Sequence, residues 1–139
     1  MESIKKILSH WLPVIFVFIL LSFLTFQPVP LFLYKIYYRA DKAVHFIIYL
    51  FMGFTLIRAF TPAFPGFNVL LISIPAIFLS AFLGTLAEAV QYFVPERIVD
   101  YSDIKANVFG SCFGITLYII IILIKSSLNK QKIIKNPKE

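Results

Sequence analysis

Six polar side chains lie within twenty residues of a chain that is otherwise strongly apolar. They are Glu88, Gln91, Arg97, Asp100, Asp103 and Asn107. Glu88 stands inside an apolar run that is long enough to cross a membrane. A carboxylate in such a run is energetically costly and marks a candidate functional site. Carboxylates can move protons or bind polar groups of a ligand, so the first question is which other residues face Glu88.

A second polar pattern begins at Asp41. Asp41, His45 and Tyr49 are four residues apart, and this spacing places their side chains on one face of a helix. Lys42 lies beside that face. Histidine exchanges protons near neutral pH, and a neighbouring carboxylate can orient its ring. The pattern therefore predicts a helix that carries an acid–base group a few ångströms below its polar end.

Two further helices are expected to carry polar faces at the same depth. Glu88 and Gln91 share a face, and Glu88 lies roughly 9 Å below the end of its apolar run at 1.5 Å per residue. Asp103 and Asn107 also share a face, and Asn107 lies roughly 6 Å below Asp103 by the same rise. We therefore expect three helices to meet in one polar pocket.

The predicted pocket contains two kinds of residue. Glu88 and His45 are the candidate catalytic acid–base pair. The candidate ligand-binding residues are Asp41, Lys42, Tyr49, Gln91, Arg97, Asp100, Asp103 and Asn107. Arg97 and Asp100 belong to the short loop that would cover the pocket. Gly84, Gly110 and Gly114 are predicted to allow close packing of the helices, as small residues do in membrane proteins.

The composition identifies the elements that must hold these residues. Of 139 residues, 60% are hydrophobic and 14% are charged. Soluble domains contain roughly 45–50% apolar and about 25% charged residues, so the chain belongs to the membrane class. Its length allows about four spans of about 20 residues each.

The sequence predicts an all-α integral membrane protein with a four-helix transmembrane bundle. The expected spans are residues 7–26, 43–60, 69–94 and 104–124. Residues 1–124 form one domain, and residues 125–139 form a basic cytoplasmic tail. Tyrosines and basic residues in the first loop are also compatible with a short interfacial helix. Asp41 and Asp103 stand where helix N-caps are expected.

Four spans place both termini on one side of the membrane. That side carries Lys5, Lys6, Arg58 and five tail lysines, eight in all, against five basic residues on the other side. The positive-inside rule therefore predicts cytoplasmic termini and a pocket that faces outward. The net charge of +6 comes largely from the tail, where a basic segment after an apolar span interacts with anionic lipid. Nucleic-acid binding is not expected.

Three segments at these spacings resemble the VanZ-like family. They are D-K-A-V-H-F-I-I-Y (41–49), E-A-V-Q-Y-F-V-P-E-R (88–97) and D-Y-S-D-I-K-A-N-V-F-G-S-C-F-G (100–114). The resemblance implies a small integral protein of the bacterial cytoplasmic (inner) membrane. It also implies a connection with the cell envelope and with antibiotic resistance, specifically low-level resistance to the glycopeptide teicoplanin.

Three functions are compatible with the pocket. It can bind an amphiphile, such as a lipid, a lipid-linked wall precursor or a lipid-tailed antibiotic. It can catalyse a reaction on such a head group, with Glu88 or His45 as the base and Arg97 stabilising negative charge. It can also be structural and hold the helices together or present a partner, as buried polar groups in membrane bundles do.

No cofactor and no metal are predicted for this pocket. An oxygen-rich site for a divalent cation could be built from Asp41, Glu88, Asp100 and Asp103. The single histidine there and the neighbouring Lys42 and Arg97 disfavour a structural zinc site. The expected partner is a membrane lipid or a lipid-linked envelope molecule, and the sequence gives no oligomeric state.

Overall fold

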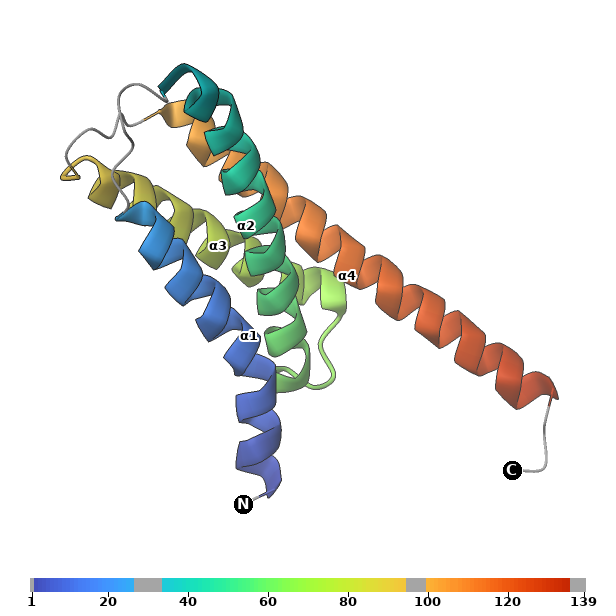
Figure 1. The fold of residues 1–139 in the computed structure, drawn as a ribbon. Helices are drawn as coiled ribbons and strands as arrows, with labels where there is room; N and C mark the ends of the chain where they lie inside the picture. Colours follow the sequence, from blue (N-terminus) through green and yellow to red (C-terminus); the bar gives the residue numbers. More distant parts are fainter. Residues whose placement is uncertain (1, 27–33, 95–99, 136–139) are drawn as a thin grey trace.

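The computed structural model describes residues 2–26, 34–94 and 100–135. They form four helices: α1 (Glu2–Thr25), α2 (Tyr34–Ala63), α3 (Val69–Gln91) and α4 (Tyr101–Lys135). No strand occurs in these ranges. The predicted all-α bundle of four helices is confirmed. Figure 1 shows that the N- and C-terminal ends of the chain lie at the same end of the bundle.

All four helices are long and apolar enough to cross a membrane. The apolar windows are Leu8–Thr25, Asp41–Ala63, Val69–Gln91 and Tyr101–Lys132. Large apolar side chains such as Phe16, Phe78 and Phe109 are exposed on the outside of the bundle. In a soluble protein such a surface would aggregate, whereas in lipid it lies against acyl chains.

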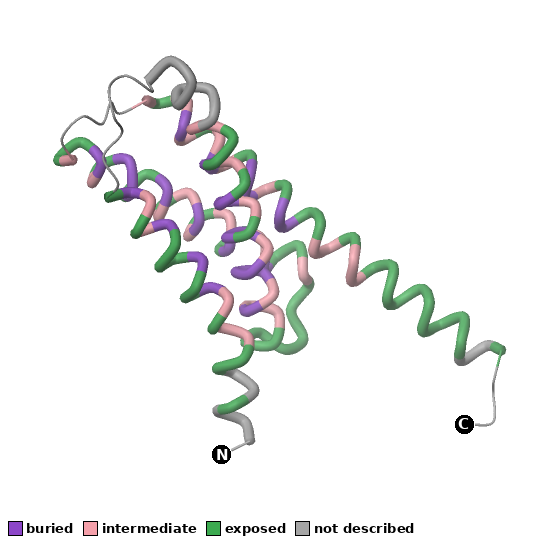
Figure 2. The backbone as a smooth tube through the Cα atoms, in the orientation of Figure 1, coloured by how far each residue is buried: buried purple, intermediate pink, exposed green. Residues whose placement is uncertain are grey.

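Helix α2 is the central element, because it packs against α1, α3 and α4. Its side chains form much of the core, including Tyr49, Met52, Leu56 and Ile57, each at most 1% exposed. Figure 2 shows buried positions on α2 along the part that the other helices surround. Apolar residues on all sides of one helix are expected when that helix is enclosed by its neighbours.

Glycines bring α4 unusually close to α2. A Cβ atom built at Gly110 would overlap the carbonyl oxygen of Phe46, and one at Gly114 would overlap that of Leu50. On α2, Gly53 lies in the same way against the backbone of Ser111. Backbones that touch at these points leave only a short distance for polar side chains to cross.

The helix starts differ from the sequence expectation. Helix α2 begins at Tyr34, so Asp41 lies inside the helix and its predicted N-cap role is wrong. The helical tendency of the first loop therefore belongs to the first turns of α2 instead of a separate helix. Asp100 caps α4, because its Oδ1 accepts a hydrogen bond from the backbone N–H of Ser102 at 2.8 Å. The predicted cap Asp103 lies in the first turn.

Two helix ends also differ. Helix α3 ends at Gln91, and Tyr92 is its C-cap, so the helix stops before residue 94. Helix α4 continues to Lys135, well beyond residue 124. Residues 123–132 are exposed along its whole circumference. This part of α4 extends away from the other helices (Figures 1 and 2).

A candidate polar site between α2, α3 and α4

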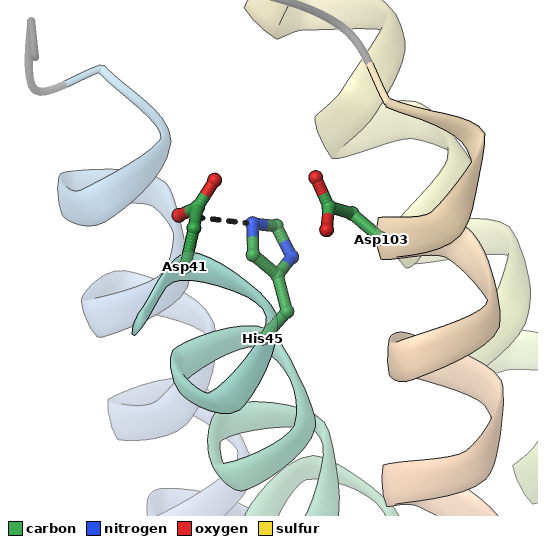
Figure 3. Close-up of side chains that lie close together, drawn as sticks. All are labelled: Asp41, His45 and Asp103. Atoms are coloured by element: carbon green, nitrogen blue, oxygen red, sulfur yellow. Dashed lines mark ion pairs between the residues drawn. The ribbon is translucent and has the colours of Figure 1, made fainter. Parts of the chain in front are cut away.

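The imidazole of His45 is the centre of the polar site. It projects from α2 and is 6% exposed. Figure 3 shows the ring between the carboxylates of Asp41, from the same helix, and Asp103, from α4. The distance from His45 Nε2 to Asp41 Oδ1 is 3.8 Å. The spacing of four residues accounts for the Asp41–His45 contact, since it places both side chains on one face of α2.

The other ring nitrogen of His45 faces α3 and α4. Its Nδ1 lies 3.0 Å from Asn107 Oδ1 and 3.6 Å from Glu88 Oε1. Both partners are acceptors, so we assign the proton to Nδ1, which donates to Asn107. The side chains from three helices therefore fix the orientation of one imidazole, as their spacing in the sequence predicts.

Lys42 connects the polar part of α2 to the beginning of α4. Its Nζ donates to Asp100 Oδ2 at 2.6 Å and to Ser102 Oγ, and it lies 3.4 Å from Asp103 Oδ1. The ammonium group is thus directed at the N-terminal turn of α4. Ser102 was not predicted as a site residue, and its only signal in the sequence is its position between Asp100 and Asp103.

The inner part of the site is buried. Tyr49 and Asn107 are 0% exposed, and Glu88 and Gln91 are 2% and 3% exposed. A Cβ atom at Gly84 would lie 3.0 Å from Asn107 Nδ2 and 3.3 Å from Tyr49 Cε1. Gly84 therefore leaves room for these two polar side chains. Among the described residues, Tyr49 Oη and Asn107 Nδ2 have no hydrogen-bond partner.

A second polar contact lies deeper in the bundle. Ser80 Oγ of α3 and Ser111 Oγ of α4 are 2.6 Å apart, and both side chains are buried. Ser111 Oγ also lies 2.8 Å from the carbonyl oxygen of Asn107. This contact holds α3 against α4 one turn below Asn107. No spacing pattern in the sequence pairs Ser80 with Ser111.

The structure describes nine of the ten predicted pocket residues, and Arg97 lies outside the described ranges. The nine come from α2, the end of α3 and the beginning of α4, and they meet at one end of the bundle. Four of the chain's seven acidic residues are in this group: Asp41, Glu88, Asp100 and Asp103. Among the described side chains of the group, Lys42 is the one lysine or arginine. The described part of the site thus combines a buried carboxylate–imidazole pair, Glu88 and His45, with more carboxylates than ammonium groups.

A pocket connects this polar site to α1. It is lined by Leu21, Leu24 and Thr25 of α1, by Asp41, Val44, His45 and Ile48 of α2, and by Gln91 of α3. The side chains from α1 are mainly apolar, and the opposite side carries a carboxylate, an imidazole and an amide. Polar and apolar walls therefore meet around one small cavity of about 20 Å³. Asp41, His45 and Asp103 are also spaced closely enough to hold a metal ion.

Comparison with known proteins supports the resemblance seen in the motifs. The family model described as VanZ/LLP1 matches residues 2–123, which include α1, α2, α3 and α4 as far as residue 123. Neither a search of curated proteins nor a search of solved structures finds a match. The family match and the four apolar helices agree on a multi-pass membrane protein. The chain belongs to the VanZ/LLP1 family.

Proposed function

We propose that this VanZ-like protein binds the polar head group of an amphiphilic envelope molecule. The observation that carries the proposal is the junction of α1, α2 and α3, where polar and apolar walls meet around a cavity of about 20 Å³. The cavity has room for about one water molecule, so α1 must move away from α2 before a ligand enters. A head group would then contact Asp41, His45 and Gln91, and the first part of its acyl or prenyl chain would lie along Leu21 and Leu24. Ligand sites commonly combine apolar walls with a few placed polar groups.

The depth of the site supports a ligand that comes from the membrane. Glu88, Gln91 and His45 belong to the apolar windows of their helices, and each is less than 7% exposed. Polar groups at such a depth are costly unless they bind each other or a ligand. Candidate ligands are a lipid, a lipid-linked wall precursor or a lipid-tailed glycopeptide such as teicoplanin. The last of these would connect the site with resistance.

The charge distribution supports an outward-facing site in the bacterial cytoplasmic membrane. Lys125, Lys130, Lys132 and Lys135 lie at the end of α4 that is remote from the site. Basic residues mark the cytoplasmic side, so both termini would be cytoplasmic. Cysteine labelling from outside intact cells tests this orientation: Tyr101→Cys should react, and Lys130→Cys should not.

Two tryptophan substitutions on α2 test ligand binding. Val44 lines the pocket and is 41% exposed, whereas Ile47 is 51% exposed and does not line it. Both positions are partly open, so both variants should fold. We expect Val44→Trp to lose lipids or added teicoplanin that co-purify with the wild-type protein, as measured by native mass spectrometry. Ile47→Trp should retain them. Equal retention by the two variants would refute binding in this pocket.

A second candidate function is catalysis on the bound head group. It is favoured by one observation, the 3.6 Å distance between Glu88 Oε1 and His45 Nδ1 in a buried environment. Glu88 would orient the imidazole, and His45 Nε2 would act as the base. Glu88→Gln should then preserve ligand binding but abolish a change in lipid composition that expression of the wild-type protein causes. If no lipid binds and none changes, the site is a structural network.

A further inference from the structure

We propose that Asp41, His45 and Asp103 form a binding site for one divalent transition-metal ion. Each residue offers one donor atom, and the three atoms lie within 4.8 Å of one another. The donors come from two helices that the glycine contacts hold together. Figure 3 shows both carboxylates turned toward the imidazole. Asp103 would complete the site by a small rotation of its side chain.

The orientation of His45 is the second observation that supports a metal. Its Nδ1–H is directed at two acceptors, Asn107 Oδ1 at 3.0 Å and Glu88 Oε1 at 3.6 Å. A metal-binding histidine typically donates its other ring N–H to such a partner, and this bond fixes the ring. The lone pair then belongs to Nε2, which is directed toward Asp41.

The distance between Nε2 and Asp41 Oδ1 also fits an ion. At 3.8 Å it is too long for a hydrogen bond. An ion bonded at about 2.0–2.2 Å to each atom would span it. A lone pair and a carboxylate that face each other directly are mutually repulsive, and an ion between them would replace this repulsion with attraction.

The charges of the surroundings favour a cation. Among the described residues, four carboxylates gather at the site, those of Asp41, Glu88, Asp100 and Asp103. Lys42 is held at the outer edge by Asp100 and Ser102, and it reaches Asp103 only at 3.4 Å. The sequence disfavours a structural zinc site because the pocket has one histidine and because Lys42 and Arg97 are nearby. In the structure the ammonium group is directed at the first turn of α4, so a cation beside His45 would share the Asp103 carboxylate with Lys42.

The donor set selects the class of ion. Two carboxylates and one imidazole suit Zn²⁺ or Mn²⁺, whereas Mg²⁺ and Ca²⁺ are usually held by oxygen atoms alone. Three protein ligands leave a coordination position for a ligand or water, as in functional zinc sites. Asp41 and His45 also line the amphiphile pocket, so the ion could contact a phosphate or carboxylate of the head group. This last step rests on the proposed function, but metal binding itself does not.

Titration with the metal alone tests the site. The full chain, purified in detergent and stripped with a chelator, should bind one Zn²⁺ or Mn²⁺ ion in isothermal titration calorimetry. Asp41→Asn, His45→Gln and Asp103→Asn should each weaken this affinity by at least about tenfold. The controls His10→Gln, at the opposite end of α1, and Val44→Trp, which changes no metal ligand, should retain it.

A spectroscopic measurement keeps the test independent of folding defects in the variants. In the wild-type protein with ¹⁵N-labelled histidine, the added ion should shift the Nε2 resonance of His45, while His10 remains unchanged. The proposal is overturned if no ion binds stoichiometrically, if the controls lose the ion as the ligand variants do, or if both His45 nitrogens stay protonated when metal is added. In that last case His45 is an imidazolium paired with its carboxylates.

The metal and the amphiphile can be tested separately. Val44→Trp blocks the pocket but changes no metal ligand, so it should bind the ion like the wild-type protein. Loss of lipid without loss of metal from this variant is the expected result. A wild-type protein that binds lipid but no metal would overturn this inference and leave the proposed function intact. A wild-type protein that binds metal but no lipid would overturn the proposed function and leave the metal site intact.

Discussion

Replacing Lys42 by methionine removes a positive charge from a group of carboxylates. The Lys42 ammonium lies 2.6 Å from Asp100 Oδ2 and 3.4 Å from Asp103 Oδ1. Methionine retains most of the length and apolar volume of the side chain, so the change is mainly electrostatic. We expect Lys42→Met to destabilise the fold, because the carboxylates lose a counter-charge in a membrane environment.

The burial of the two acids decides how large the effect is. At 3.4 Å two unit charges attract by about 1 kcal/mol in water and by about 5 kcal/mol at an effective dielectric constant near 20. The side chain of Asp103 is 5% exposed, so the attraction that it loses with Lys42 lies toward the larger value. The side chain of Asp100 is 25% exposed, so water partly solvates its charge when the lysine is removed. Removing one partner of a buried pair costs about 3–5 kcal/mol. The Lys42 side chain is itself 32% exposed, so we expect a smaller loss of about 2 kcal/mol here.

A second substitution, added to Lys42→Met, identifies which of the two acids causes the loss of stability. Unfolding by SDS in mixed micelles, with chelator present, measures the free energy of unfolding of each variant. Adding Asp103→Asn to Lys42→Met should restore most of the lost stability, because it removes the buried unpaired charge. Adding Asp100→Asn should restore less. The reasoning fails if Lys42→Met is as stable as the wild-type protein, or if Asp100→Asn rescues it as well as Asp103→Asn does.

Two further predictions concern the packing that supports the site. Gly114→Ala should reduce stability by about 1–3 kcal/mol, because its Cβ meets the backbone of α2. Gly84→Ala should cost less, because its Cβ meets only side chains. Unfolding in SDS measures the order of the two effects, and the reverse order would contradict the helix contacts. A double-mutant cycle of Ser80→Ala and Ser111→Ala should give a coupling of only about 0.6 kcal/mol, the average for hydrogen bonds between membrane helices. A coupling well above about 2 kcal/mol would mean that this pair has a larger role than a single hydrogen bond.

The position of the site could be predicted because two simple constraints, span length and residue spacing, define it. Spans of membrane length fix which helix ends meet, and spacings of three or four residues fix which side chains share a helix face. Asp41, His45, Glu88 and Asn107 therefore could be assigned to one end of the bundle from the sequence alone. The resemblance to VanZ-like proteins rests on the same residues, and the family match confirms it.

Helix starts and side-chain directions could not be predicted in the same way. Apolar length locates the part of a helix that lies in lipid, but backbone hydrogen bonds continue into the interface, so α2 begins seven residues before Asp41. The direction of the Lys42 side chain depends on its rotamer and on its contact with Ser102. Ser102 belongs to no spacing pattern in the sequence. The arrangement of Asp41, His45 and Asp103 also depends on side-chain rotamers, which residue spacing does not give.

The closeness of α2 and α4 connects packing with chemistry. Asp103, Asn107, Gly110 and Gly114 lie on one face of α4, so the glycines that touch α2 continue the line of the polar residues. The side chain of Asn107 is short and reaches His45 at 3.0 Å only because the two backbones approach so closely one turn away. Polar contacts between membrane helices are individually weak, and they cannot pull two helices together against bulky side chains. The small residues must therefore set the distance between the helices, and the hydrogen bond to His45 then selects the orientation of its ring. In this arrangement the glycine face of α4 is a positioning element for His45 as well as a packing surface.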